Sequence, residues 1–173
     1  VDEDFGVVGL RLNPWSGSET VFARRIDPAR ARIANVPLPS SGHRHGDIVL
    51  HDGAQVGERS YLGRTVPVFN ELQRLRASAN ATFTVFVSCS SDEEIEALKR
   101  MSTQGVALVE DWTVGLRTQC LRCTYGVPHQ HRRHAAGHDE DWNPDRTLGV
   151  AASNAGQVRA RLQEWAAQAP DRR

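Results

Sequence analysis

The chain has 173 residues, of which 39% are hydrophobic, and its 21 basic and 21 acidic side chains balance. That length fits one domain, or one domain with a small addition, and is sufficient to bury a core. The balanced charge gives no basic excess to attract nucleic acid or an anionic membrane, and no stretch has the roughly 18 apolar residues that span a bilayer.

The first part of the chain is dominated by strand patterns. Four segments carry the β-branched or alternating side chains that favour strands: residues 5–12, 20–25, 30–36 and 48–50. Pro37 and Pro39 end the third segment, because proline has no backbone donor for a ladder. Asp52–Gly53 predicts a turn directly after the fourth segment.

The middle of the chain mixes helix and strand patterns. Residues 68–77 predict a short helix, because Phe69, Leu72 and Leu75 recur at helical spacing. Residues 82–87, with the sequence Thr-Phe-Thr-Val-Phe-Val, have the clearest strand pattern in the chain.

A strand–helix–strand run follows from residue 82 onward. Ser91 and Glu94 have the spacing of a capping box, which predicts a helix from there to about Met101. Gly105 ends this helix, and residues 106–109 are typical of another strand. Such a run predicts a right-handed crossover between parallel, neighbouring strands.

The chain closes with a predicted helix whose N-cap is Asn154 and whose apolar stripe holds Val158, Leu162 and Trp165. Together the elements predict an α+β fold. It has a small β-rich N-terminal unit, a split βαβ (ferredoxin-like) unit, a Cys/His-rich segment and a C-terminal helix. We expect residues 1–115 to form the α+β core. Residues 116–173 would hold the Cys/His-rich segment and the helix, packed on that core.

The segment over residues 117–146 is poor in large apolar side chains and rich in side chains that bind metals. A C-x-x-C pair is followed by four histidines within a short distance. Zinc prefers thiolate and imidazole ligands in a tetrahedron, and a C-x-x-C turn presents two sulfurs to one ion. The expected zinc ligands are Cys120, Cys123, His129 and His131, with His134 or His138 as a replacement for either histidine.

Several interpretations of this segment stay open. Two Cys and two His leave no open coordination position, which favours a structural ion, whereas a catalytic ion would keep a bound water. Asp139, Glu140 and Asp141 are the acidic residues available as a general base for such a water. Without metal, the pair could be free cysteines beside solvated histidines, or a redox C-x-x-C, although no helix pattern follows it directly.

Other reactive side chains lie outside this segment. The stretch Ser41–Asp47 contains His43 and His45, which could add ligands to the same ion, form a separate acid/base pair, or belong to a surface loop. Cys89 follows a strand, where it could be a nucleophile or a small buried apolar residue. The arginine pairs at residues 24–25 and 132–133 could bind phosphate or lie on solvated faces.

Three short motifs occur along residues 20–110. They are an aromatic-Ala pair at Phe22-Ala23, an Asn-x-Pro at residues 35–37 and a Gly-Asp-x-Val at residues 46–49. With the later strand, helix and strand, this order resembles a family of small bacterial proteins of unknown function, over about half of the chain. The resemblance implies a β-rich unit followed by a split βαβ unit. It implies no activity, and the Cys/His segment lies outside it.

These features predict a zinc-stabilised protein-interaction or regulatory module that acts on a protein partner. Three cysteines with one close pair do not fit a secreted disulfide framework, and the acidic N-terminus has no signal-peptide pattern, so we expect the bacterial cytoplasm. The alternative is a metal-dependent hydrolase, such as a phosphodiesterase or nuclease, in which His129, His131 and His134 bind the metal. The sequence leaves open which of the two applies, and it leaves the oligomeric state open.

Overall fold

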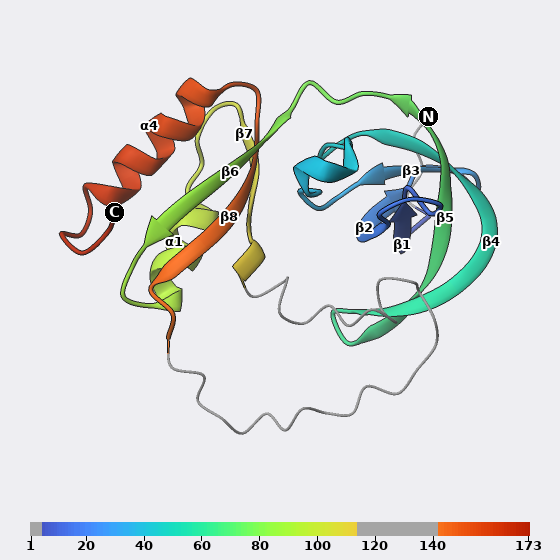
Figure 1. The fold of residues 1–173 in the computed structure, drawn as a ribbon, viewed down its shortest axis with the longest axis horizontal. Helices are drawn as coiled ribbons and strands as arrows, with labels where there is room; N and C mark the ends of the chain where they lie inside the picture. Colours follow the sequence, from blue (N-terminus) through green and yellow to red (C-terminus); the bar gives the residue numbers. More distant parts are fainter. Residues whose placement is uncertain (1–4, 114–141) are drawn as a thin grey trace.

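The computed structural model describes residues 5–113 and 142–173, and strands dominate this part of the chain (Figure 1). The described residues contain eight strands, two α-helices and one short 3-10 helix. Their strands form a closed five-stranded barrel and a separate three-stranded sheet. Figure 1 shows the barrel on one side of the molecule and the sheet, with its helices, on the other.

The barrel is formed by the first five strands. They are β1 (Val7–Leu12), β2 (Glu19–Arg25), β3 (Arg30–Ile33), β4 (Ile48–Tyr61) and β5 (Arg64–Arg76). β1 pairs antiparallel with β2 and parallel with β5, and this second pairing closes the barrel. Successive side chains of a strand point to opposite faces, so Val8, Leu10 and Leu12 all enter the buried core.

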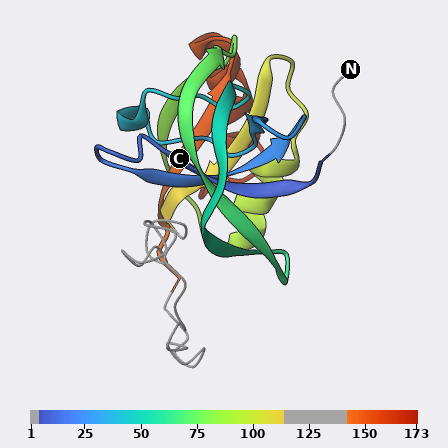
Figure 2. The same cartoon turned by 90° about the vertical axis from the view of Figure 1, so that its right-hand side faces the viewer.

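β4 and β5 form a long antiparallel hairpin whose tip, in green, projects beyond the other strands in Figure 2. Its turn is the dipeptide Leu62-Gly63, with φ of 49° and 76°. Positive φ at both turn positions matches the twist of the flanking strands, and it is easy for glycine but unusual for leucine. Register shifts on both sides of His51 let the hairpin bend around the barrel.

The second sheet consists of β6 (Ala81–Ser88), β7 (Val106–Asp111) and β8 (Asp145–Ala152). β8 lies in the middle and is antiparallel to both neighbours. Two helices, α1 (Asp92–Arg100) and α4 (Ala155–Ala166), pack on one face of this sheet. Ile95 and Leu98 of α1 and Trp165 of α4 are buried there against Leu148 and Val150 of β8.

The other face of the sheet contacts the barrel through the segment that follows β3. Val36, Trp112 and Ala151 form a small apolar cluster, and the Trp112 indole N–H donates a hydrogen bond to the Val36 carbonyl at 3.3 Å. Gly149 permits this approach, because a Cβ at that position would lie 2.2 Å from the Trp112 ring. The two units therefore share a packed and hydrogen-bonded junction.

The predicted α+β fold with a split βαβ (ferredoxin-like) unit is wrong. Strands hold 47% of the described residues and helices 18%, so the protein is mostly β. The strands at residues 82–87 and 106–109 exist, but they are not neighbours, because β8 lies between them. β8 was not predicted from the sequence, because Gly149, Ala151 and Ala152 give it a weak strand pattern. In the structure β8 is almost fully buried.

The predicted helix over residues 68–77 is also wrong, because these residues belong to β5. Phe69 is buried, but Leu72 is 57% and Leu75 is 47% exposed. The three apolar residues at helical spacing therefore do not form one buried face. Pairing with both β1 and β4 outweighs the local preference. Asp52–Gly53 lies inside β4 rather than in a turn after it.

Several other predicted elements are confirmed. The patterns at residues 5–12, 20–25 and 30–36 correspond to β1, β2 and β3, and the last two helices correspond to α1 and α4. Asn154 caps α4 as expected, since its Oδ1 accepts the Gln157 amide at 3.1 Å. At α1 the capping differs: the Ser91 side chain makes no cap hydrogen bond, and Glu94 accepts the Ser90 amide at 2.7 Å. Among the described helices, none is long and apolar enough to cross a membrane.

Candidate functional site

The predicted zinc ligands lie outside the described residues, so the zinc site stays a prediction. These ligands are Cys120, Cys123, His129 and His131, with His134 or His138 as a replacement for either histidine. Within residues 5–113 and 142–173, no three His, Cys, Asp or Glu side chains are grouped so that they could hold a metal ion.

His43 is buried at the barrel, and both of its ring nitrogens face oxygen atoms. Nε2 lies 3.0 Å from Oε1 of Glu71 in β5, and Nδ1 lies 3.0 Å from the Ser41 carbonyl oxygen. Two oxygen acceptors require two donors, and only the protonated imidazolium has a hydrogen on both nitrogens. The hydrogen bond to Glu71 accordingly raises the pKa of His43, although burial opposes it.

Glu71 is buried beside this histidine and forms an ion pair with it when the imidazole is protonated. Burial alone would raise the pKa of Glu71, but hydrogen bonds from His43 and from the Asn13 amide outweigh it and lower that pKa. The Asn13 side chain also donates to the Ser41 carbonyl at 2.8 Å. Because both His43 nitrogens already have partners, neither is free to act as a general base. The cluster ties β5 to the loop after β1 and to the 3-10 helix η1 (Pro39–Ser41).

The rest of the stretch Ser41–Asp47 is also held by hydrogen bonds. Asp47 is fully buried and accepts the Ser78 amide at 2.7 Å and the Arg44 amide at 3.0 Å. The Nδ1 of His45 lies 3.2 Å from the Asn35 carbonyl oxygen. The structure therefore gives His43 and Asp47 a structural role in pinning this loop to the barrel.

Two carboxylates that the sequence analysis did not single out lie at the junction between barrel and sheet. Glu19 of β2 accepts the Leu38 amide at 3.1 and 3.2 Å. Glu110 of β7 accepts the Val36 amide at 2.9 Å and the Asn35 side chain at 2.6 Å. Burial raises the pKa of both carboxyl groups, that of Glu19 to about 7, where the charge of Glu110 adds to the effect. A lone glutamate in a sequence carries no signal of such burial.

Cys89 behaves as a core residue rather than as a nucleophile. It is almost fully buried in the cluster between the sheet and its helices. Burial raises the pKa of its thiol, and the charge of Glu94 adds to that rise. Its sulfur lies 3.7 Å from the Ser91 carbonyl oxygen, an acceptor that cannot remove its proton. At neutral pH it is therefore a protonated, unreactive thiol.

The basic residues of the barrel make local contacts. Arg30 pairs with Asp27 at 2.5 Å. Arg25 donates to the Pro28 carbonyl at 2.8 Å and lies over the Phe69 ring. Arg25 and Arg30 therefore have partners within the barrel itself.

The outer edge of β6 carries backbone groups that no strand among the described residues pairs with. The Ser88 amide donates to the Arg173 carbonyl at 2.8 Å, and the Arg173 amide donates to the Ser88 carbonyl at 3.1 Å. The backbone groups of Ser88 therefore point away from β8. Because backbone groups alternate along an antiparallel strand, those of Phe86, Thr84 and Thr82 point the same way. In the part of the chain that the structure describes, these three positions have no backbone partner on that side.

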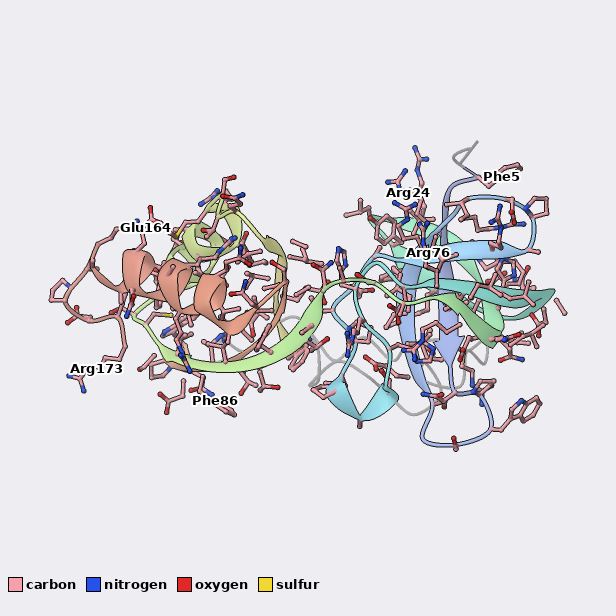
Figure 3. All side chains as sticks on the ribbon, turned by 90° about the horizontal axis from the view of Figure 1, so that it is seen from above. Phe5, Arg24, Arg76, Phe86, Glu164 and Arg173 are labelled. Atoms are coloured by element: carbon pink, nitrogen blue, oxygen red, sulfur yellow. The ribbon has the colours of Figure 1, made fainter. Side chains whose placement is uncertain are left out.

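Phe86 makes this edge apolar. It is 77% exposed, whereas Phe83, Val85 and Val87 pack into the core beneath the helices. Figure 3 shows Phe86 projecting from β6 on the side away from α4. The sequence predicted a strand here, but not that one of its edges is open. A further strand added at this edge would satisfy the free backbone groups and shield the aromatic ring.

In comparisons with known proteins, no protein-family model, no curated protein and no solved structure matches the chain. The resemblance to small bacterial proteins of unknown function therefore stays a prediction.

Proposed function

We propose that this chain is a protein-interaction module that binds an extended strand of its partner along the outer edge of β6. The observation that supports this function is an edge that is regular and, among the described residues, open from Thr82 to Phe86. The pairing of β6 with β8 runs without a register shift from Ala81 to Ser88, and these eight residues include no charged residue and no proline.

Such an edge is unusual, because natural sheets protect edge strands with charges, prolines or bulges against unwanted pairing. β7, the opposite edge of the same sheet, is protected in this way. It has a register shift, a bulge or irregularity in the pairing with β8, between Val106 and Leu108. This contrast between the two edges of one sheet favours a binding role for the edge of β6. In strand addition, backbone hydrogen bonds supply affinity and the alternating side chains supply specificity.

The metal and the compartment belong to this proposal as predictions from sequence. Zinc bound by Cys120, Cys123 and the neighbouring histidines would order the segment between β7 and β8, which is poor in apolar side chains. The cysteine pattern favours the bacterial cytoplasm. Among the described residues we find no feature that favours the alternative, a metal-dependent hydrolase.

The test uses a fluorescent peptide with the sequence of residues 80–88 as a probe strand. One version is N-methylated at the positions of Thr82, Thr84 and Phe86, and a matched control is N-methylated at the positions of Phe83, Val85 and Val87. Only one of these sets can face β6 in a paired strand. Losing three donors, each about 1 kcal/mol, should weaken binding roughly 100-fold for that version alone.

Fluorescence anisotropy of the peptide, titrated with the unaltered protein, measures this difference. Binding that one methylation pattern abolishes and the other leaves intact supports strand addition. Binding that both patterns affect equally, or no binding of the unmethylated probe, refutes the proposed function.

A further inference from the structure

We infer that the strand bound by β6 is the β6 of a second copy of this chain, in a twofold antiparallel pair centred on Thr84. This inference rests on the proposed function, because it names the partner for the same edge. It follows from the positions, side chains and charges along β6, which are complementary to their own copy.

The backbone positions of β6 that are free among the described residues are symmetric about Thr84. They are Thr82, Thr84 and Phe86, and the pair between Ser88 and Arg173 ends the open stretch on one side. A twofold axis at Thr84 sets it against the partner's Thr84, and sets Phe86 against the partner's Thr82. Every free position then has a partner with which it exchanges both backbone hydrogen bonds. The Ser88–Arg173 pair exchanges both bonds as well, so this edge already accepts an antiparallel neighbour.

The side chains brought together by this register are favourable ones. On the face away from the helices, Phe86 would lie beside the partner's half-buried Thr82, and the two exposed Thr84 side chains would meet at the axis. On the face covered by helices, Val85 contacts the partner's Phe83. Pairs of aromatic with β-branched residues, and threonine with threonine, stabilise antiparallel strands.

The charge pattern also favours a second copy. A twofold axis places residues near it against their own copies, so any charge there meets a like charge. Residues 77–91 contain no charged side chain, so no charge of the strand itself meets its own copy. Arg173, which pairs with Ser88 on this edge, lies at its end and away from the axis. A partner of another kind would place no such restriction on the edge.

The expected dimer is weak, because one pair of short strands buries less than the roughly 1,600 Å² of a standard stable interface. We expect a dissociation constant on the order of 10⁻⁵ to 10⁻⁴ M. The association should therefore depend on protein concentration over a range that sedimentation can reach.

The experiment compares the full chain with the variants Thr84→Lys and Thr84→Glu by sedimentation velocity. Thr84 is exposed, and far-UV circular dichroism verifies that both variants fold. Each variant sets two like charges against each other at the axis and should weaken dimerisation at least about tenfold. An equimolar mixture should recover dimers, because lysine then faces glutamate. Thr65→Lys, an exposed position in the barrel hairpin, is the matched control and should dimerise like the unaltered chain.

A chain that stays monomeric up to about 1 mM, or Lys and Glu variants that dimerise as well as the unaltered chain, would overturn the inference. If the chain is monomeric but the probe peptide binds with the expected methylation pattern, the second copy is the wrong partner and the proposed function stands. If neither association occurs, both fail.

Discussion

The carboxyl group of Glu19 should make the stability of this protein depend on pH near neutrality. Its pKa in the folded protein is about 7, against 4.5 for an ordinary glutamate, and burial at the junction is the main cause. As the pH rises from 4.5 towards 7, the unfolded chain loses this proton while the folded chain keeps it. Stability that is present at low pH is therefore lost through this window.

The size of the effect follows from the shift of about 2.5 pH units. At 1.36 kcal/mol per unit, this amounts to an upper limit of about 3 kcal/mol of unfolding free energy. Glu19→Gln keeps an oxygen to accept the Leu38 amide but cannot ionise. It should therefore be more stable than the unaltered chain at about pH 8, and closer to it at about pH 5.

Urea unfolding followed by tryptophan fluorescence, at several pH values between about 5 and 8, measures this difference. The hydrogen bond to Glu71 raises the pKa of His43, and this histidine also makes stability depend on pH. The informative quantity is therefore the difference between the variant and the unaltered chain at each pH. Glu164→Gln on the exposed side of α4 is the control and should leave the pH profile unchanged. A difference for Glu19→Gln that stays constant across this range would refute the reasoning.

Three further results are expected. Gly149→Ala should cost about 2 kcal/mol and shift the fluorescence of Trp112, because the new Cβ forces the ring out of its cluster; an unchanged urea midpoint would contradict this packing. Glu71→Gln should cost about 3 kcal/mol at about pH 6, and less as the pH rises through the raised pKa of His43, because the buried ion pair then no longer forms. An equal cost at about pH 9 would exclude the imidazolium. The purified native protein should contain about one zinc ion per chain by atomic absorption, and Cys120→Ser should lose it; metal-free native protein would remove the zinc prediction.

The elements that the sequence predicted correctly depend on local signals. β1 and β2 are rich in β-branched and other apolar side chains within their own length, and α4 carries its cap at Asn154 together with its apolar stripe. The elements that the sequence analysis missed or assigned wrongly are strands whose pairing strands are distant in the chain. β5 is a strand because β1 and β4 pair with it, and β8 is a strand because it completes the sheet between β6 and β7.

The same distinction applies to the candidate site. A strand at residues 82–87 was evident from its β-branched and aromatic side chains, but its open edge depends on β8 taking the other side. The burial of Glu19 and Glu110 likewise depends on how the barrel meets the sheet. His43 was singled out for its chemistry, and only the position of Glu71 in the folded barrel identifies it as part of an ion pair.

Hydrogen exchange of individual β6 amides is the most direct measurement of whether its outer edge pairs with a strand. At high protein concentration, the amides of Thr82, Thr84 and Phe86 should exchange slowly, and on dilution they should become fast. The amides of Phe83 and Val85, which face β8, should stay slow at both concentrations. Fast exchange of the outer amides at every concentration, with or without the probe peptide, would contradict pairing at this edge.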